Sequence, residues 1–139
     1  MSFKEKVAWV MLVVMVLAYG GYFYSILGAL SAGVAVGEIP YRGAMLATVV
    51  VVIVLAVVGT VAVTIAARGD DASDERDREI DRRGAWLGGI VLSVGVLGGI
   101  ALAMYEAAPF WIANLLLLSL VLAEITAGVR KLVLYRRGV

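Results

Sequence analysis

Four long stretches with almost no charged residues limit what this chain can fold into. Residues 7–30, 44–67 and 84–105 carry no charge, and residues 109–129 carry only Glu124. An α-helix needs about 20 apolar residues to cross the hydrocarbon core of a bilayer. Lipid offers the backbone no hydrogen bonds, and stretches of this length without polar alternation suit helices rather than barrel strands. The sequence therefore predicts an all-α integral membrane four-helix bundle.

Length and composition agree with one membrane domain. The chain has 139 residues, of which 63% are hydrophobic, and residues 1–139 form a single predicted domain. Soluble proteins contain roughly 45–50% apolar residues. The first stretch is longer than the roughly 7–15 apolar residues of a secretory signal peptide, so we expect it to be retained as a helix.

Residue types that the chain lacks restrict its chemistry. There are no cysteines and no histidines, which removes disulfides, thiolate nucleophiles, imidazole bases and the usual zinc sites. The basic residues lie at the ends of the apolar stretches rather than on one soluble face, so direct nucleic-acid binding is not expected. We expect no catalytic residue, no cofactor, no metal site and no enzymatic activity.

The basic residues also predict an orientation. All of them except Arg42 fall in the N-terminal segment, in residues 68–83 or after residue 129. By the positive-inside rule these segments are cytoplasmic, and so are both termini. Aromatic residues near the ends of the stretches are expected to be interfacial anchors: Trp9, Trp86, Trp111, Tyr19, Tyr22, Tyr24 and Tyr105.

The cytoplasmic charged loop, residues 68–83, holds most of the acidic residues. Ser73 is a good N-cap, and Asp74 and Glu75 suit the first turn, so we expect a helix that begins near Asp74 and continues into the third span. Spacing predicts ion pairs of Asp74 with Arg78 and of Glu79 with Arg83. Ile80 is expected to contact either the inner ends of the bundle or a partner. The candidate partner-binding residues are Asp74, Glu75, Arg76, Arg78, Glu79 and Ile80.

The string Asp74-Glu75-Arg76-Asp77-Arg78-Glu79-Ile80 between the second and third spans resembles the juxtamembrane motif of a family of small, uncharacterised four-span prokaryotic membrane proteins. The ending Leu134-Tyr135-Arg136-Arg137-Gly138 resembles bacterial members of that group. Such proteins are often encoded beside helix-turn-helix regulators. The resemblance implies a multi-pass protein of the prokaryotic plasma (inner) membrane. Such a protein would either restrain a transcription factor or pass a sensed signal to it, and the resemblance assigns no catalytic residue.

Small residues predict where helices pack. Gly84, Gly88, Gly95 and Gly99 share one face of the third span, and such faces allow another helix to approach closely. The sequence leaves open whether that helix belongs to this chain or to a second copy. A short turn at residues 106–108 before Pro109 predicts an antiparallel hairpin. Residues 31–43 suit a loop, a short interfacial helix or an extension of the first span, with no helical start before Tyr41.

Glu124 is the one carboxylate inside a span. Lys131, Arg130, Arg68 or Lys6 is within reach for a structural ion pair, while the alternative is a proton-carrying group of a transporter. Asn114 on the same helix points elsewhere and is expected to form an interhelical hydrogen bond.

Two functions are compatible with these features. The first is a non-enzymatic membrane protein that packs into an oligomer or complex and presents its charged loop to a soluble partner, with a transcriptional regulator as the partner that the resemblance implies. The second is a small dimeric transporter or channel that uses Glu124 as its intramembrane ionisable residue.

Overall fold

The computed structural model describes residues 3–66 and 75–137, and this part of the chain is almost entirely helical. Its elements are α1 (Phe3–Ser31), a 3-10 turn (Val36–Glu38), α2 (Tyr41–Ala66), α3 (Glu75–Met104) and α4 (Pro109–Arg137). Each of the four α-helices is long and apolar enough to cross a membrane. The predicted all-α arrangement of four membrane-spanning helices is therefore confirmed.

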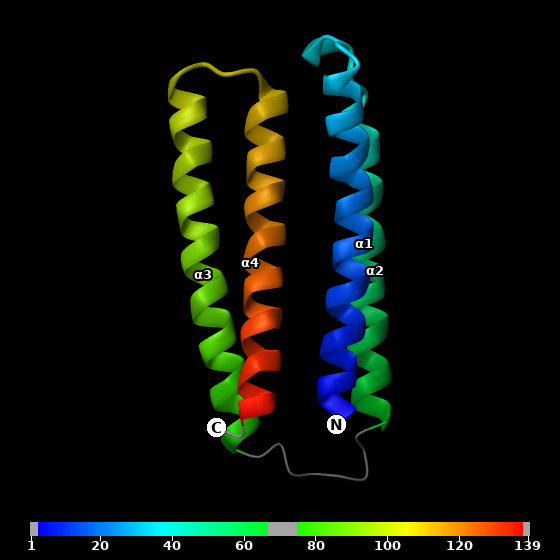
Figure 1. Cartoon of the computed structure of the whole chain (residues 1–139), viewed down its shortest axis with the longest axis vertical. Helices are drawn as coiled ribbons and strands as arrows, with labels where there is room; N and C mark the ends of the chain where they lie inside the picture. Colours follow the sequence, from blue (N-terminus) through cyan, green and yellow to red (C-terminus); the bar gives the residue numbers. More distant parts are fainter. Residues whose placement is uncertain (1–2, 67–74, 138–139) are drawn as a thin grey trace.

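The helices run in alternating directions; α3, α4 and α1 stand side by side in Figure 1, and α2 lies behind α1. α4 is central: it packs closely along α3 on one side and against α1 on the other, and α1 in turn packs against α2. The spatial order is therefore α3–α4–α1–α2. Residues 3 and 137 lie at the same end of the row, which we call the terminal end.

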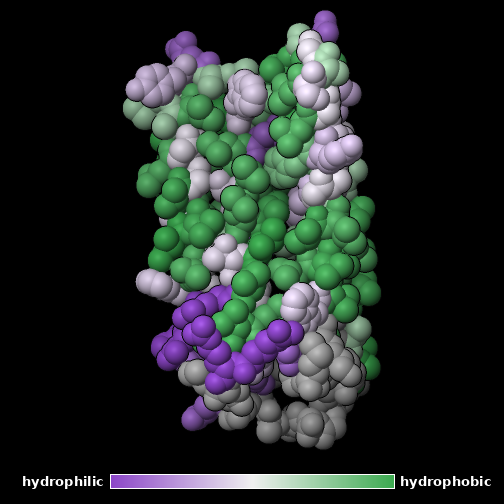
Figure 2. Space-filling model, viewed as in Figure 1, coloured by the Kyte–Doolittle hydropathy of each residue, from purple (hydrophilic) through white to green (hydrophobic). Residues whose placement is uncertain are grey.

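The face of the molecule seen in Figure 2 is mostly apolar. Hydrophilic side chains gather over the terminal ends of α3 and α4, whereas apolar side chains cover the middle of the visible face. No residue of α2 with a described side chain is buried. Exposed apolar surface on this scale is what lipid tails cover in a membrane protein.

The four glycines of the predicted packing face all lie against α4 of the same chain. A Cβ added at Gly88 would lie 2.8 Å from the carbonyl oxygen of Ala123, and one at Gly84 would lie 3.0 Å from that of Ala127. Gly95 faces Ser119, and Gly99 faces Leu116. Because α4 already covers this face, a second copy would have to use another surface.

One helix agrees with the predicted bounds at its start, and another extends beyond them. α3 begins at Glu75, in agreement with the predicted helical extension before the third span, while Ser73 and Asp74 lie outside the described residues. α4 continues to Arg137, well past the expected end at residue 129. Its last two turns are amphipathic, with Leu132 and Leu134 buried, so packing extends the helix beyond its uncharged stretch.

The connection from α1 to α2 combines a turn with a single 3-10 turn rather than extending the first helix. Gly33 has a φ of 77°, and the amide of Val34 donates to the carbonyl of Ala29 (3.1 Å). This is the pattern of a glycine that ends a helix. α2 then begins at Tyr41, directly after Pro40, as the sequence predicted.

The expected antiparallel hairpin of α3 and α4 is present, and Glu106 carries its turn. The amide of Ala107 donates to the carbonyl of Leu102 (3.0 Å), and that of Glu106 donates to the carbonyl of Ala103 (3.1 Å). In this motif the residue at the position of Glu106 is usually glycine, because its backbone is left-handed. Glu106 adopts that conformation with a φ of 53°.

Replacing Glu106 by glycine is therefore expected to raise the free energy of unfolding by about 1 kcal/mol, since it removes left-handed backbone strain. Unfolding of the purified protein in mixed micelles by increasing sodium dodecyl sulfate measures the change. Gly33→Ala, which introduces the same strain at the other turn, is the control and should shift the transition in the opposite direction. A Glu106→Gly protein that unfolds earlier than the parent would contradict this explanation of the turn.

Candidate functional site

At the terminal end, the start of α3 packs against the end of α4, and both helices carry charged residues there. Ile80 is an apolar residue with charged neighbours in the sequence, and it is only 2% exposed. It lies one helical turn before Gly84, on the face of α3 that meets α4. Burial of Ile80 thus fixes the first turns of α3 to the bundle, and Ile80 is not available to a soluble partner as the sequence had allowed.

Two polar contacts reinforce this attachment. The hydroxyl of Tyr135 on α4 donates to Oδ1 of Asp77 on α3 (3.2 Å). The ammonium of Lys131 lies 2.9 Å from Oδ1 of Asp81. The first of these contacts links Asp77, near the start of α3, to Tyr135, near the end of α4.

The end of α4 also contacts α1. The guanidinium of Arg136 lies 4.0 Å from a carboxylate oxygen of Glu5 and 5.8 Å from the ring centre of Trp9. A guanidinium near an aromatic face gains a cation–π attraction. α4 therefore connects α3 and α1 at the terminal end, as it does in the middle of the row.

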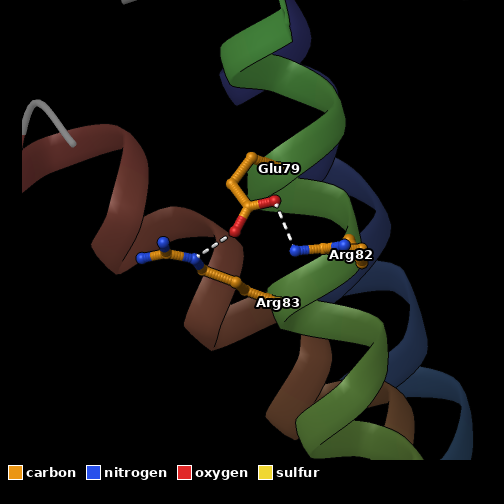
Figure 3. Close-up of polar contacts among 3 residues, drawn as sticks. All are labelled: Glu79, Arg82 and Arg83. Atoms are coloured by element: carbon orange, nitrogen blue, oxygen red, sulfur yellow. Dashed lines mark hydrogen bonds and ion pairs between the residues drawn. The ribbon is translucent and has the colours of Figure 1, made fainter.

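Glu79 forms an ion-pair cluster on α3, in which Arg83 extends toward α4 (Figure 3). Its carboxylate accepts a 2.7 Å hydrogen bond from Nε of Arg83 and lies 3.1 Å from a terminal nitrogen of Arg82. The predicted pair of Glu79 with Arg83 is thus present. These residues precede the uncharged stretch that begins at Gly84. The hydrogen bond from Arg83 lowers the pKa of Glu79, so the carboxylate stays ionised at neutral pH.

The candidate partner-binding residues separate into three groups. Glu75 and Arg78 are exposed, and Glu79 is partly exposed. Ile80 is buried. Asp74 and the side chain of Arg76 lie outside what the structure describes, and so does the predicted pair of Asp74 with Arg78.

Glu124 is exposed on α4, and Lys131, one of the four basic residues considered for an ion pair with it, pairs with Asp81 instead. No described side chain forms a hydrogen bond or ion pair with Glu124. Pairing with Arg68 or with the side chain of Lys6 falls outside the described residues.

Asn114 forms the interhelical hydrogen bond that the sequence predicted. Its Oδ1 accepts from the hydroxyl of Tyr22 on α1 (2.8 Å), and its amide nitrogen donates to the carbonyl of Phe110 (2.8 Å). Tyr22 and Tyr19 are both 5% exposed, so they belong to the core between α1 and α4 instead of the expected interfacial belt. Tyr24 and Tyr105 are exposed.

A basic hollow lies beside the Glu79 cluster, and the sequence did not predict it. It has a volume of about 740 Å³, and Glu79, Arg82, Arg83, Trp86, Leu87 and Arg130 line it. Trp86 follows Arg83 by three residues, which places the two on one side of the helix. Arg130 belongs to a different helix, and only the packing of α4 on α3 brings it to this hollow.

Among residues 3–66 and 75–137, no three acidic side chains are grouped so that they could hold a metal ion. Comparison with known proteins found no matching family model, no similar curated protein and no similar solved structure.

Proposed function

We propose that the protein is a non-enzymatic, multi-pass membrane protein that presents the charged start of α3 to a soluble cytoplasmic protein, within an oligomer or a larger membrane complex. A transcriptional regulator is the kind of partner that the sequence resemblance implies. The prokaryotic plasma membrane is the location that the same resemblance implies.

The main support for this proposal is that the charged segment is helical and fixed in position. From Glu75 onward the segment belongs to α3, and Ile80, Asp77 and Asp81 attach it to α4. Glu75 and Arg78 remain exposed on this support. A partner that binds an ordered surface does not incur the entropy cost of ordering a loop, so such a surface suits stable recognition.

The proposal requires the terminal end to face the cytoplasm. Basic residues are concentrated there, in keeping with the positive-inside rule. Arg42 and Glu38, by contrast, lie at the opposite end of the row, near the start of α2.

Cysteine labelling tests the orientation directly, because the chain contains no native cysteine. In intact cells a membrane-impermeant maleimide is expected to label a Glu38→Cys protein and to leave a Glu75→Cys protein unlabelled until the membrane is permeabilised. Both positions are exposed, so accessibility to solvent alone should not separate them. Labelling of the Glu75→Cys protein in intact cells would reverse the orientation and remove the proposed surface from the cytoplasm.

Charge reversal tests recognition by the partner. Proteins that co-purify with the parent are compared with those that co-purify with the triple substitution Arg76→Glu, Arg78→Glu and Glu79→Arg. The proposal expects the triple substitution to lose a soluble protein or to change transcription of a neighbouring gene. The matched control reverses Glu38 and Arg42 at the opposite end and should retain the partner. An unchanged set of co-purifying proteins and unchanged transcription would count against the proposal.

A second candidate function is a dimeric transporter or channel that uses Glu124. The observation in its favour is that Glu124 is exposed within the fourth apolar stretch and that Lys131 is engaged elsewhere. An ionisable group at such depth is costly unless a partner, a proton or water compensates it. If Glu124→Gln abolished transport or drug resistance in whole cells while the protein still assembled, the transporter function would replace the first proposal.

A further inference from the structure

The basic hollow at the terminal end combines charge with an apolar wall. Arg82 and Arg83 line it from α3, and Arg130 lines it from α4, around a volume of about 740 Å³. The side chains of Arg82 and Arg83 are 80% and 48% exposed, so both can reach a bound molecule. Arg130 is also exposed.

The charge of the hollow favours an anion. Three arginines, Arg82, Arg83 and Arg130, line the hollow, but only one acidic residue, Glu79, does so. Each guanidinium has five N–H donors, and Glu79 engages only Nε of Arg83 and one terminal nitrogen of Arg82. Donors therefore remain on both residues, and a phosphate group offers the geometry that arginine binds most strongly.

The remaining wall is apolar and leads toward the membrane. Trp86 and Leu87 follow Gly84, where the uncharged part of α3 begins. Trp86 is 69% exposed, and tryptophan is enriched at the level of lipid headgroups. A soluble acidic peptide would gain nothing from an apolar wall that enters the bilayer, whereas a lipid presents an anionic group and an acyl chain in this same order.

We propose that the hollow binds an anionic phospholipid, with its phosphate against Arg82, Arg83 and Arg130 and the first part of an acyl chain along Trp86 and Leu87. Basic pockets between transmembrane helices are a known form of lipid-headgroup recognition. Glu79 competes with the phosphate for Arg82 and Arg83. The lipid therefore displaces part of the ion-pair cluster of Figure 3 when it binds.

Binding of phosphatidylglycerol tests this site. The purified protein in nanodiscs of phosphatidylcholine is titrated with phosphatidylglycerol, and lipid-bound protein is counted by native mass spectrometry. Arg82→Gln, Arg83→Gln and Arg130→Gln are each expected to weaken binding about fivefold. Arg137→Gln removes the same charge at the same end of α4 but outside the hollow, and it should change binding less than about twofold. Equal losses in all four variants would show general attraction to basic surface and overturn the site.

Glu79→Gln provides a test with the opposite sign. Removing the carboxylate frees Arg82 and Arg83, so phosphatidylglycerol is expected to bind about fivefold more tightly. This substitution keeps the shape of the side chain, and it leaves the contacts of Ile80 intact. Unchanged or weaker binding would contradict the proposed competition.

The source of the phosphate is tested separately with soluble sn-glycerol 3-phosphate. If it competed with phosphatidylglycerol at equal concentration, the hollow would be a site for free phosphate esters, and the lipid assignment would be wrong.

Discussion

Replacing Gly88 by leucine is expected to lower the free energy of unfolding by about 3 kcal/mol and to push α3 away from α4, because overpacking of a close helix contact is unfavourable. A Cβ at this position would lie 2.8 Å from the carbonyl oxygen of Ala123 and 3.1 Å from Cβ of Ala127. The nearest obstacle is backbone, which cannot rotate away as the end of a flexible side chain can. The two helices would have to move apart along their interface.

The adjacent glycine supplies the control for this prediction. A Cβ at Gly89 would meet nothing within 4 Å, so Gly89→Leu makes the same chemical change on the same helix without a contact. Its effect is expected to stay within about 0.5 kcal/mol. Unfolding in mixed micelles compares the two proteins. If both were equally stable, the close packing of α3 on α4 would not determine stability.

Replacing Ile80 by alanine is expected to cost about 3 kcal/mol, because the side chain is almost fully buried. Ile80 differs from the apolar residues farther along α3 in its surroundings. It lies among charged residues at the terminal end, where water rather than lipid would contact it if it were exposed. Burial of Ile80 therefore removes apolar surface from water and stabilises the packing of α3 on α4. Inside a bilayer this hydrophobic contribution is absent, because lipid tails are themselves apolar.

The local character of this effect can be measured by hydrogen exchange. In the Ile80→Ala protein, amides near the start of α3 are expected to exchange faster, while those near Gly99 keep their protection. Ile100→Ala removes the same atoms from a half-exposed position of the same helix and should have little effect. Faster exchange along the whole of α3 would show that Ile80 does not act as a local anchor.

The uncharged stretches predicted the number and type of helices well, because satisfaction of the backbone in lipid leaves few alternatives. The start of α3 was also predictable, since Glu75 and its neighbours suit a first helical turn. The extension of α4 to Arg137 was not expected, because charged residues after Glu124 suggested an earlier end. The burial of Leu132 and Leu134 shows that packing continues along this part of the helix.

Side-chain partners were harder to predict than helices. The spacing of Glu79 and Arg83 within one helix was sufficient to pair them. Lys131 was one of four basic residues considered as an ion-pair partner of Glu124, but it pairs with Asp81 on α3. Tyr22 was predicted to lie at the membrane–water interface from its position along the first span alone. Its burial depends instead on which face of α1 meets Asn114. In each case the missing information was the order and rotation of neighbouring helices, which periodicity within one helix does not contain.

The spatial order α3–α4–α1–α2 has a consequence for the connectivity of the chain. α2 and α3 are consecutive in sequence, but α2 packs against α1 and α3 packs against α4, while the start of α1 and the end of α4 lie at the same end of the bundle (Figure 1). A circular permutant that begins at residue 75, with the native termini joined by a short linker, would carry its helices in the order in which they stand in space. Every helix would then pack against its successor, and the average sequence separation of contacts would fall, which favours faster folding. The new termini would also lie at the terminal end, so the permutant would keep the orientation of every helix in the membrane.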